Sequence, residues 1–158
     1  MKTALVFTLL LLATLIVSAI VLGILSRSGS PAGLVDGRLA RCPQKPNCVC
    51  SEYPDATDAW IAPLPLGTGG FTTLMPRIRD AVTSLGGKIG NSDDLYLAAT
   101  FSSSLFGFVD DLELRIDPER RLLHLRSASR VGYSDLGINR KRVEHFKQQL
   151  ISRLQQPR

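Results

Sequence analysis

The sequence has few of the side chains that usually build metal centres. Its 158 residues include two histidines, three cysteines and one tryptophan. The cysteines are spaced C-x5-C and C-x-C, which matches none of the common zinc patterns. The chain also lacks the G-x-S-x-G nucleophile elbow of serine hydrolases and the Gly-Lys-Ser/Thr ending of a phosphate-binding loop. We therefore predict no metal site, no cofactor and no serine-hydrolase triad.

Charge is missing from the beginning of the chain. Between Lys2 and Arg27 there is no charged residue, and Ala4 to Leu25 is mainly apolar. A bilayer is spanned by about 20 apolar residues, whereas the apolar part of a cleaved signal peptide has roughly 7–15. This pattern predicts an uncleaved transmembrane signal anchor over residues 1–26, which contacts the membrane through residues 4–25. A cleaved signal peptide is the alternative.

The chain after the anchor divides into a tether and one domain. Residues 27–41 are rich in Gly and Ser without a helical period, which is typical of a flexible tether. Residues 42–158 are long enough for a single domain. Arg27, Arg38 and Arg41 follow the span and favour a cytoplasmic domain, but the cysteines favour export. We expect the domain on the periplasmic side of a bacterial cytoplasmic membrane.

The basic balance of the chain does not indicate a nucleic-acid partner. The formal net charge is +5, but it is unevenly distributed. From Cys42 to Glu119, five Lys/Arg stand against eleven Asp/Glu, and from Arg120 to Lys147 eight stand against two. Opposite charges within one compact domain largely neutralise each other. We expect no nucleic-acid binding.

Hydrophobic periodicity predicts the fold class. Helical spacing indicates one helix over 71–85, with its cap at Thr72 or Thr73, and another that begins near Leu136. Period-two alternation indicates a strand over 95–101 and a hairpin over 106–130, and a short strand is expected at 88–91. The order predicts an α+β, two-layer domain, with a curved antiparallel sheet and two helices on one face, preceded by one N-terminal transmembrane helix.

The hairpin carries an unusual density of charge. If the turn is Asp117 to Arg120 and closes symmetrically, it places Asp110 on the apolar face of the sheet. A carboxylate there costs several kcal/mol unless a cation or hydrogen bonds compensate it. The same register predicts six cross-strand pairs: Ile116 with Arg121, Leu114 with Leu123, Leu112 with Leu125, Asp110 with Ser127, Glu113 with His124, and Asp111 with Arg126.

These charges and the following basic segment form the candidate site. Its residues are Asp110, Asp111, Arg126, Ser127, Ser129, Arg130, Asn139 and Arg140. One interpretation is a site for an unknown small anionic ligand or a membrane protein partner, beside a helix N-terminus. The other is structural: Arg130, Arg140 or Arg142 pairs with an aspartate and ties helix to sheet.

For function, the expectation is a membrane-anchored domain that binds without catalysis. One alternative is a hydrolase that uses Asp110 or Asp111 as a base with the arginines holding an anionic substrate. Another is a structural subunit of a membrane complex, whose sign would be an exposed apolar patch.

The cysteines fall in one short segment. Two prolines and an asparagine lie between Cys42 and Cys48, so the ends of this loop could meet in a disulfide, which would favour an oxidising compartment. A metal site and free thiols remain open as alternatives. Cys50 could compete with Cys48 for Cys42.

Several motifs taken together resemble a known family. They are Cys42-Pro43 to Pro46-Asn47-Cys48-Val49, Ile61-Ala62-Pro63-Leu64, Phe106 to Asp111, Arg126 to Gly132, and Ser134-Asp135-Leu136-Gly137 through Asn139-Arg140. The chain from Arg41 to Leu154 resembles the family of domains of unknown function numbered 1499. That family has two cysteines in its opening motif and usually serine at the place of Cys50. The resemblance therefore implies a Cys42–Cys48 bridge, and it implies no activity.

Overall fold

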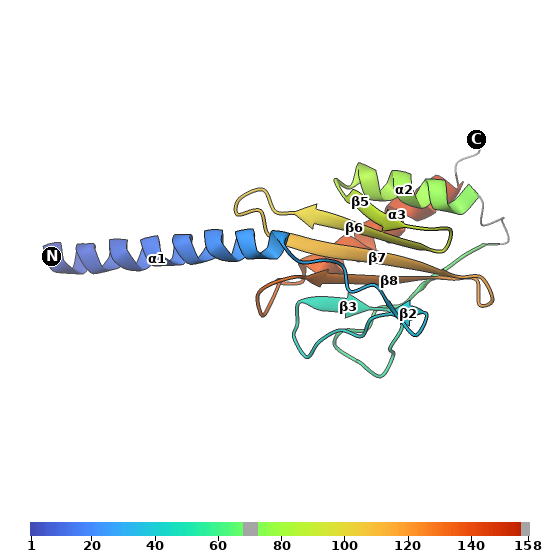
Figure 1. Ribbon diagram of the computed structural model, residues 1–158, viewed down its shortest axis with the longest axis horizontal. Helices are drawn as coiled ribbons and strands as arrows, with labels where there is room; N and C mark the ends of the chain where they lie inside the picture. Colours follow the sequence, from blue (N-terminus) through green and yellow to red (C-terminus); the bar gives the residue numbers. More distant parts are fainter. Residues whose placement is uncertain (68–72, 156–158) are drawn as a thin grey trace.

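A long helix leads into a small mixed domain in the computed structural model, which describes residues 1–67 and 73–155 (Figure 1). The expected helix start at Phe71 and cap at Thr72 lie outside the described residues. The helices are α1 (Lys2–Arg27), α2 (Leu74–Ser84) and α3 (Ile138–Gln155). The strands are β1 (Leu34–Val35), β2 (Arg38–Leu39), β3 (Cys48–Cys50), β4 (Leu64–Pro65), β5 (Lys88–Ser92), β6 (Tyr96–Ser102), β7 (Val109–Asp117) and β8 (Leu122–Ser129).

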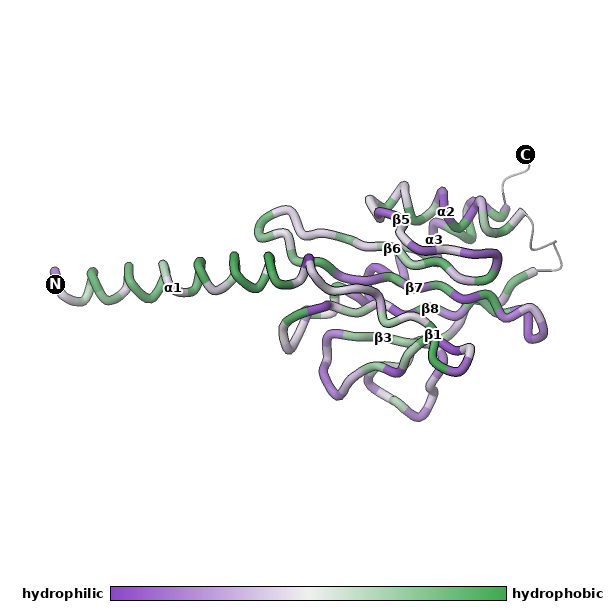
Figure 2. The backbone as a smooth tube through the Cα atoms, in the orientation of Figure 1, coloured by the Kyte–Doolittle hydropathy of each residue, from purple (hydrophilic) through white to green (hydrophobic). Residues whose placement is uncertain are grey.

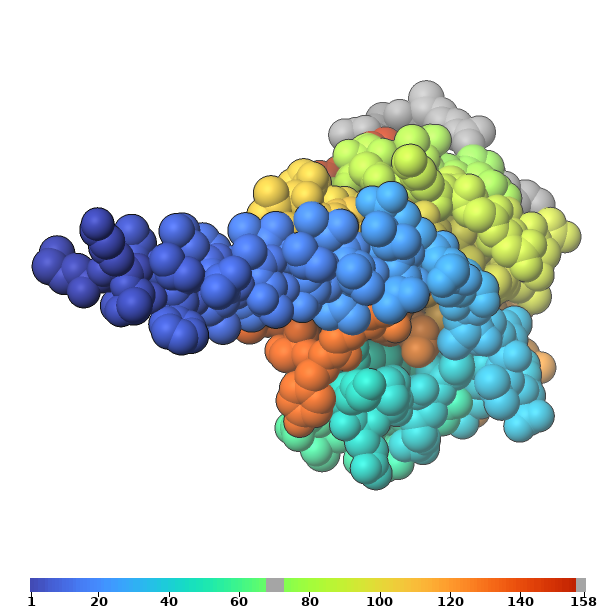
Figure 3. Space-filling model, turned by 60° about the vertical axis from the view of Figure 1, so that its left-hand side comes forward, coloured from blue at the N-terminus to red at the C-terminus, as the bar shows by residue number. Residues whose placement is uncertain are grey.

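Helix α1 is long and apolar enough to cross a membrane. It is apolar along almost its whole length, and most of that length projects away from the domain (Figure 2). Only its last turns touch the domain, where Gly23 and Ser26 are buried (Figure 3). A side chain at Gly23 would collide with the carbonyl oxygen of Phe106, so the close approach requires glycine.

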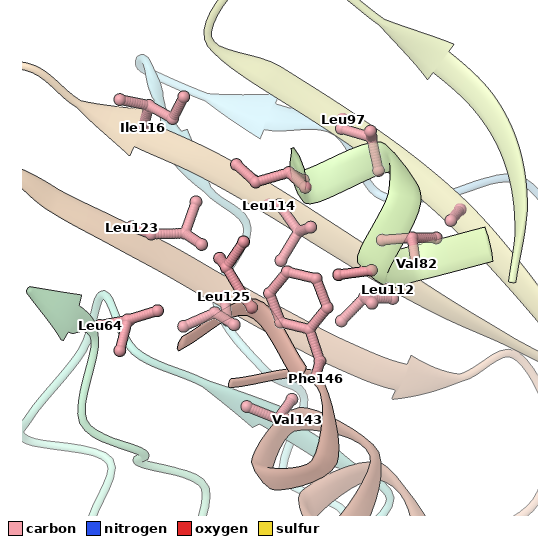
Figure 4. Packing of buried hydrophobic residues seen from close by; sticks show 14 of the residues in the cluster. Leu64, Val82, Leu97, Leu112, Leu114, Ile116, Leu123, Leu125, Val143 and Phe146 are labelled. Atoms are coloured by element: carbon pink, nitrogen blue, oxygen red, sulfur yellow. The ribbon is translucent and has the colours of Figure 1, made fainter. Parts of the chain in front are cut away.

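The domain consists of an open antiparallel sheet with helices α2 and α3 on one face. The strand order is β3-β8-β7-β6-β5, with β4 also paired to β8. The apolar residues that alternate along β7 and β8 meet those of both helices in one core (Figure 4). Phe146 of α3 and Val82 of α2 are completely buried in it. The predicted two-layer α+β domain preceded by a helix is confirmed.

The register of the β7–β8 hairpin differs from the prediction. Asp117 pairs with Leu122, so the loop is residues 118–121 and lies one residue later than expected. Two features hold it there: Arg121 adopts a positive φ of 53°, and the Asp117 carboxylate accepts a hydrogen bond from the Arg120 N–H at 3.0 Å. Each strand keeps its predicted faces, because a shift of one residue in both strands changes the pairing by two.

The six predicted cross-strand pairs are therefore wrong. The observed pairs are Leu114 with Leu125, Asp110 with Ser129, Glu113 with Arg126, and Asp111 with Ala128.

The segment expected to be a flexible tether packs against the domain. It contains the small β1–β2 hairpin, whose turn at Asp36 and Gly37 has positive φ at both residues. Leu39 is completely buried in a second cluster with Cys50, Tyr96 and Ala98. The predicted irregular chain is therefore held over the sheet face opposite the helices, because that face carries polar groups that need partners.

Candidate functional site

The eight predicted site residues lie on both faces of the sheet and at one exposed position. Because side chains alternate along a strand, Asp110 faces the helices whereas its neighbour Asp111 faces the other side. The same alternation separates Ser127 and Ser129 from Arg126 and the adjoining Arg130. The predicted cluster is therefore two clusters, with the sheet between them.

The first cluster, which we call the α3 junction, consists of Asp110, Ser127, Ser129, Asn139 and Arg142. Arg142 donates to the Asp110 carboxylate at 2.6 Å and to the Ser127 hydroxyl at 3.1 Å. Asn139 is buried, accepts a hydrogen bond from Ser127 Oγ at 2.6 Å and donates to Ser129 Oγ at 3.0 Å. These contacts tie α3 to β7 and β8, as the structural interpretation predicts.

Asn47, from the loop between Cys42 and Cys48, completes the α3 junction. Its carbonyl oxygen accepts hydrogen bonds from the Ser129 N–H at 2.9 Å and from Asn139 Nδ2 at 3.0 Å. Its side chain donates to the Gly132 carbonyl at 3.0 Å. The cysteine loop is thereby held against the end of β8 and the start of α3.

The second cluster, the ionic row, consists of Asp111, Glu113, Arg126 and Arg130 on the face opposite the helices. Arg130 donates to both oxygens of Asp111, at 2.9 and 2.7 Å. Arg126 donates to Glu113 at 2.7 Å, and the Glu113 side chain is completely buried. Bidentate and charge-assisted bonds of this kind are stronger than neutral ones.

Glu113 has two further donors. The Tyr96 hydroxyl and the Gly33 N–H each donate to its Oε1 at 2.7 Å. Burial, followed by this hydrogen bond to Glu113, raises the pKa of Tyr96, so the phenol stays protonated as a donor. Protein donors therefore compensate the buried charge of Glu113. Through the Gly33 N–H, the ionic row also holds the segment that was predicted to be a tether.

Glu52 continues this charged face toward the far end of the sheet. Its carboxylate accepts hydrogen bonds from Arg115 at 2.7 Å and from Arg38 at 3.0 Å. Burial works to raise the pKa of Glu52, but the hydrogen bonds from the two arginines outweigh it and lower the pKa overall. Glu52 is thus an ionised structural carboxylate that fixes β2 to β7.

A serine and a histidine also meet on this face. The Ser51 hydroxyl lies 3.1 Å from His124 Nδ1 and accepts a hydrogen bond from the Leu125 N–H at 2.9 Å. Both side chains are buried under the N-terminal segment. A nucleophile has to reach its substrate, so this pair is placed for packing and not for attack.

The buried position of His124 predicts that the domain loses stability in acid. Burial lowers its pKa, although the carboxylates of Glu52 and Asp117 act in the opposite direction. Since the unfolded histidine has a pKa of about 6.5, the unfolded state takes up a proton that the folded state does not. The free energy of unfolding should therefore fall as the pH drops below about 6.5, by at most about 1.4 kcal/mol per pH unit.

The measurement is urea unfolding of the full chain in detergent micelles between pH 7.5 and 5. The variant His124→Gln should lose most of the slope in this range, because the lowered pKa of Glu52 acts only at more acidic pH. An equal slope in both proteins would contradict the role of His124.

A groove of about 670 Å³ lies beside the cysteine loop. One wall is the loop from Arg41 to Pro46, which the Cys42–Cys48 disulfide closes. The second wall is residues 55–59, and the third is the chain between β8 and α3, with Tyr133 and Asp135. The expected disulfide is confirmed, and it shapes one side of this groove.

The charged side chains around the groove differ in their partners. Arg41 pairs with Asp55 at 2.8 Å. Asp135 accepts hydrogen bonds from the Asn139 N–H at 2.7 Å and the Gly137 N–H at 3.0 Å. The helix N-terminus proposed as an anion position is therefore occupied by a carboxylate of the chain itself. Among residues 1–67 and 73–155, the partners of Arg140 are neutral groups, the carbonyl oxygens of Asp58 and Trp60.

Of the eight predicted site residues, only Arg140 lines the groove. The other seven are hydrogen-bonded to protein groups, in the α3 junction or in the ionic row. Asn47 and Lys45, which the prediction did not include, lie in the cysteine loop. Arg142, which the structural interpretation named as one possible partner of an aspartate, is three residues from Asn139 and therefore on the same face of α3.

Comparison with known families assigns the domain to a family. A model of the family described as "Protein of unknown function (DUF1499)" matches residues 38–150. The chain belongs to this family. The resemblance stated from the sequence motifs is thus confirmed, and a search of curated proteins found no match.

The DUF1499 match begins in β2 and leaves α1 outside. It includes the cysteine loop, both clusters and the walls of the groove. Cys50 is free and buried, and burial raises the pKa of its thiol. Cys50 therefore holds little thiolate with which to attack the neighbouring bridge.

Loss of the bridge should destabilise the DUF1499 domain. A closed loop of this size removes about 2 kcal/mol of chain entropy from the unfolded state. The double variant Cys42→Ser/Cys48→Ser should lose that amount in urea unfolding, and its stability should not respond to reductant. Cys50→Ala is the control, and it should keep the response to reductant. A response in the double variant would show that another thiol pair stabilises the fold.

Proposed function

We propose that this protein is a membrane-anchored DUF1499 domain that binds an anionic ligand or a partner protein, without catalysis, in the groove beside its disulfide. The observation that carries the proposal is the groove of about 670 Å³, whose rim includes Lys45 and Arg140. Its volume falls within the range of ligand-binding sites. Neither Asp110 nor Asp111 lines it, so the hydrolase alternative gains no support.

The proposed anchor is the uncleaved helix α1. Its 26 residues extend over roughly 39 Å at about 1.5 Å per residue, enough for a hydrocarbon core of about 30 Å. Ser26 supports retention of the helix, because its hydroxyl accepts the Val109 N–H at 3.0 Å and its carbonyl accepts Arg130 Nη1 at 3.2 Å. Cleavage before Ser26 would remove α1 and its Gly23 contact from the domain.

The proposed side of the membrane is the periplasmic side of a bacterial cytoplasmic membrane. The Cys42–Cys48 bridge supports this assignment, since disulfides persist in oxidising compartments. The bridge also positions Asn47, and through it the α3 junction. The domain is therefore expected to reach full stability only where the bridge can form.

The proposed ligand carries negative charge because two of the three cations that line the groove, Lys45 and Arg140, form no ion pair within the described residues 1–67 and 73–155. Arg140 instead donates to the carbonyl oxygens of Asp58 and Trp60. An anionic group between them would gain charge-assisted hydrogen bonds. Three acids also line the groove: Asp55 is paired with Arg41, Asp135 accepts backbone N–H groups, and Asp58 is the acid that the ligand has to avoid.

Site-specific photo-crosslinking in native membranes tests this function. A photoreactive residue replaces Gln44 on the exposed rim of the groove, and the control places it at Glu119 on the distant β7–β8 turn. We expect a defined adduct by mass spectrometry from position 44 and none from 119. Lys45→Glu combined with Arg140→Glu should reduce the adduct at least several-fold.

Equal labelling at positions 44 and 119 would contradict the groove as a binding site. An adduct that survives both charge reversals would contradict the anionic character of the ligand. Retention of the Cys42–Cys48 bridge in the variants checks that the groove wall is intact.

A further inference from the structure

Two loops at one end of the domain expose large apolar side chains. In the β6–β7 loop, Leu105 is 79% exposed. In the β8–α3 loop, Tyr133 is 70% and Leu136 is 87% exposed. Isolated exposed apolar residues are ordinary, but here they gather at the tips of two neighbouring loops.

Helix α1 leaves the domain between these loops. In Figures 1 and 3 the β6–β7 loop lies on one side of its last turns and the β8–α3 loop on the other. Gly23 packs against the Phe106 carbonyl on the first side. On the second side, Arg130 at the start of the β8–α3 loop donates to the Ser26 carbonyl at 3.2 Å.

The contacts between the loops and α1 lie near the end of the apolar part of the helix. The apolar run ends at Leu25, and Gly23 lies about 3 Å before that end at about 1.5 Å per residue. Phe106 therefore lies beside a part of the helix that is still apolar. If α1 crosses a bilayer, the loop that carries Leu105 is at the boundary between headgroups and acyl chains.

The opposite end of the domain has a different character. The β7–β8 turn exposes Glu119 and Arg120, and Figure 2 shows it as hydrophilic, in contrast with the apolar tips beside α1. The asymmetry follows the position of the helix. Apolar loops are found at the end where lipid would be, and a charged turn at the end that would face water.

The backbone conformation of Leu136 holds this side chain at the surface. Its φ of 54° is in the left-handed region, which side chains other than glycine rarely adopt. Its N–H donates to Ser134 Oγ at 3.3 Å, and this turn leaves 87% of the residue exposed. Burial of the Leu136 side chain in lipid would remove this apolar surface from water.

We propose that the β6–β7 and β8–α3 loops insert into the surface of the bilayer that α1 crosses and hold the domain on it in one orientation. Leu105 and Leu136 enter the acyl boundary, and Tyr133 lies among the headgroups, where amphipathic aromatic rings are enriched. Tyr133 also lines the groove. The groove therefore opens close to the lipid surface. The inference goes beyond ligand binding and does not depend on it.

The test uses the full chain in nanodiscs of phosphatidylcholine and phosphatidylglycerol. Leu105→Cys, Leu136→Cys and the control Glu119→Cys are each labelled with an environment-sensitive nitrobenzoxadiazole dye. Labelling is specific, since Cys42 and Cys48 are bridged and Cys50 is only 2% exposed. The quencher is a phosphatidylcholine with a nitroxide near the start of its acyl chain.

We expect blue-shifted emission and at least threefold stronger quenching at positions 105 and 136 than at 119. Quenching at 105 and 136 equal to that at 119 would overturn the proposal. Blue-shifted emission without quenching would overturn it too, because a second copy or another protein would then cover the loops. Flotation with vesicles checks insertion of α1 separately, and photo-crosslinking at Gln44 reports on the groove independently.

Discussion

Replacing Arg126 with methionine should lower the free energy of unfolding by about 3–5 kcal/mol. The change leaves the carboxylate of Glu113 completely buried without its cation, and only the Tyr96 hydroxyl and the Gly33 N–H still donate to it. Breaking a buried ion pair on one side has this cost because the remaining charge is uncompensated. Urea unfolding of the full chain in micelles, followed by circular dichroism, measures the change.

Two controls separate charge from packing. The double variant Arg126→Met/Glu113→Met should recover most of the lost stability, because no unpaired charge remains. Arg41→Met breaks the exposed pair with Asp55 and should leave the unfolding midpoint nearly unchanged. If the double variant were as unstable as the single one, packing and not charge compensation would explain the loss.

Replacing Asn139 with leucine should cost about 3 kcal/mol, because it removes three hydrogen bonds of the α3 junction, at about 1 kcal/mol each. Ser127 Oγ and Ser129 Oγ each lose a bond to the amide, and the Asn47 carbonyl loses one of its two donors. Arg142 also contacts the Asn139 side chain and would retain Asp110 and Ser127. The same unfolding measurement applies.

Lys141→Leu provides the matched control on α3. Lys141 is exposed, so the same substitution there should change the stability little. Faster hydrogen exchange in α3 and the end of β8 of the Asn139→Leu variant would locate the loss at the α3 junction. A uniform increase in exchange over the whole domain would contradict a local role of the α3 junction.

Much of the domain could be predicted from periodicity alone. The alternation of Leu112, Leu114 and Ile116 gave the correct face of β7, and helical spacing gave α2 and α3. The positions of the charges also followed from alternation, which correctly put Asp110 on the helix side. These features depend on local pattern, which a single sequence contains.

The pairing within the hairpin could not be predicted, for a physical reason. Two four-residue loops, 117–120 and 118–121, are compatible with the same sequence, and they differ in which residue adopts a positive φ. Arg121 does so here, although arginine carries no strong signal for that conformation. The choice is fixed by the cross-strand partners, including Glu113 with Arg126.

The split of the predicted site could not be seen either. A string of polar residues in one hairpin looks like one cluster until the sheet separates its faces. Gly33 and Leu39 lie in the segment that was predicted to be a tether. The Gly and Ser residues of this segment show no hydrophobic period, so the sequence gives no sign that it packs on the sheet. The groove was missed because residues 133–140, which form one wall, are distant in sequence from the two neighbouring segments that form the others.

We propose that the domain lies outside the cytoplasm, where the Cys42–Cys48 bridge forms and positions Asn47. Alkylation of the native membrane protein under denaturing conditions without reductant, followed by intact mass spectrometry, tests this directly. We expect one alkyl group per chain, on Cys50. Three alkyl groups per chain would contradict it, because the bridge would be absent where the protein resides.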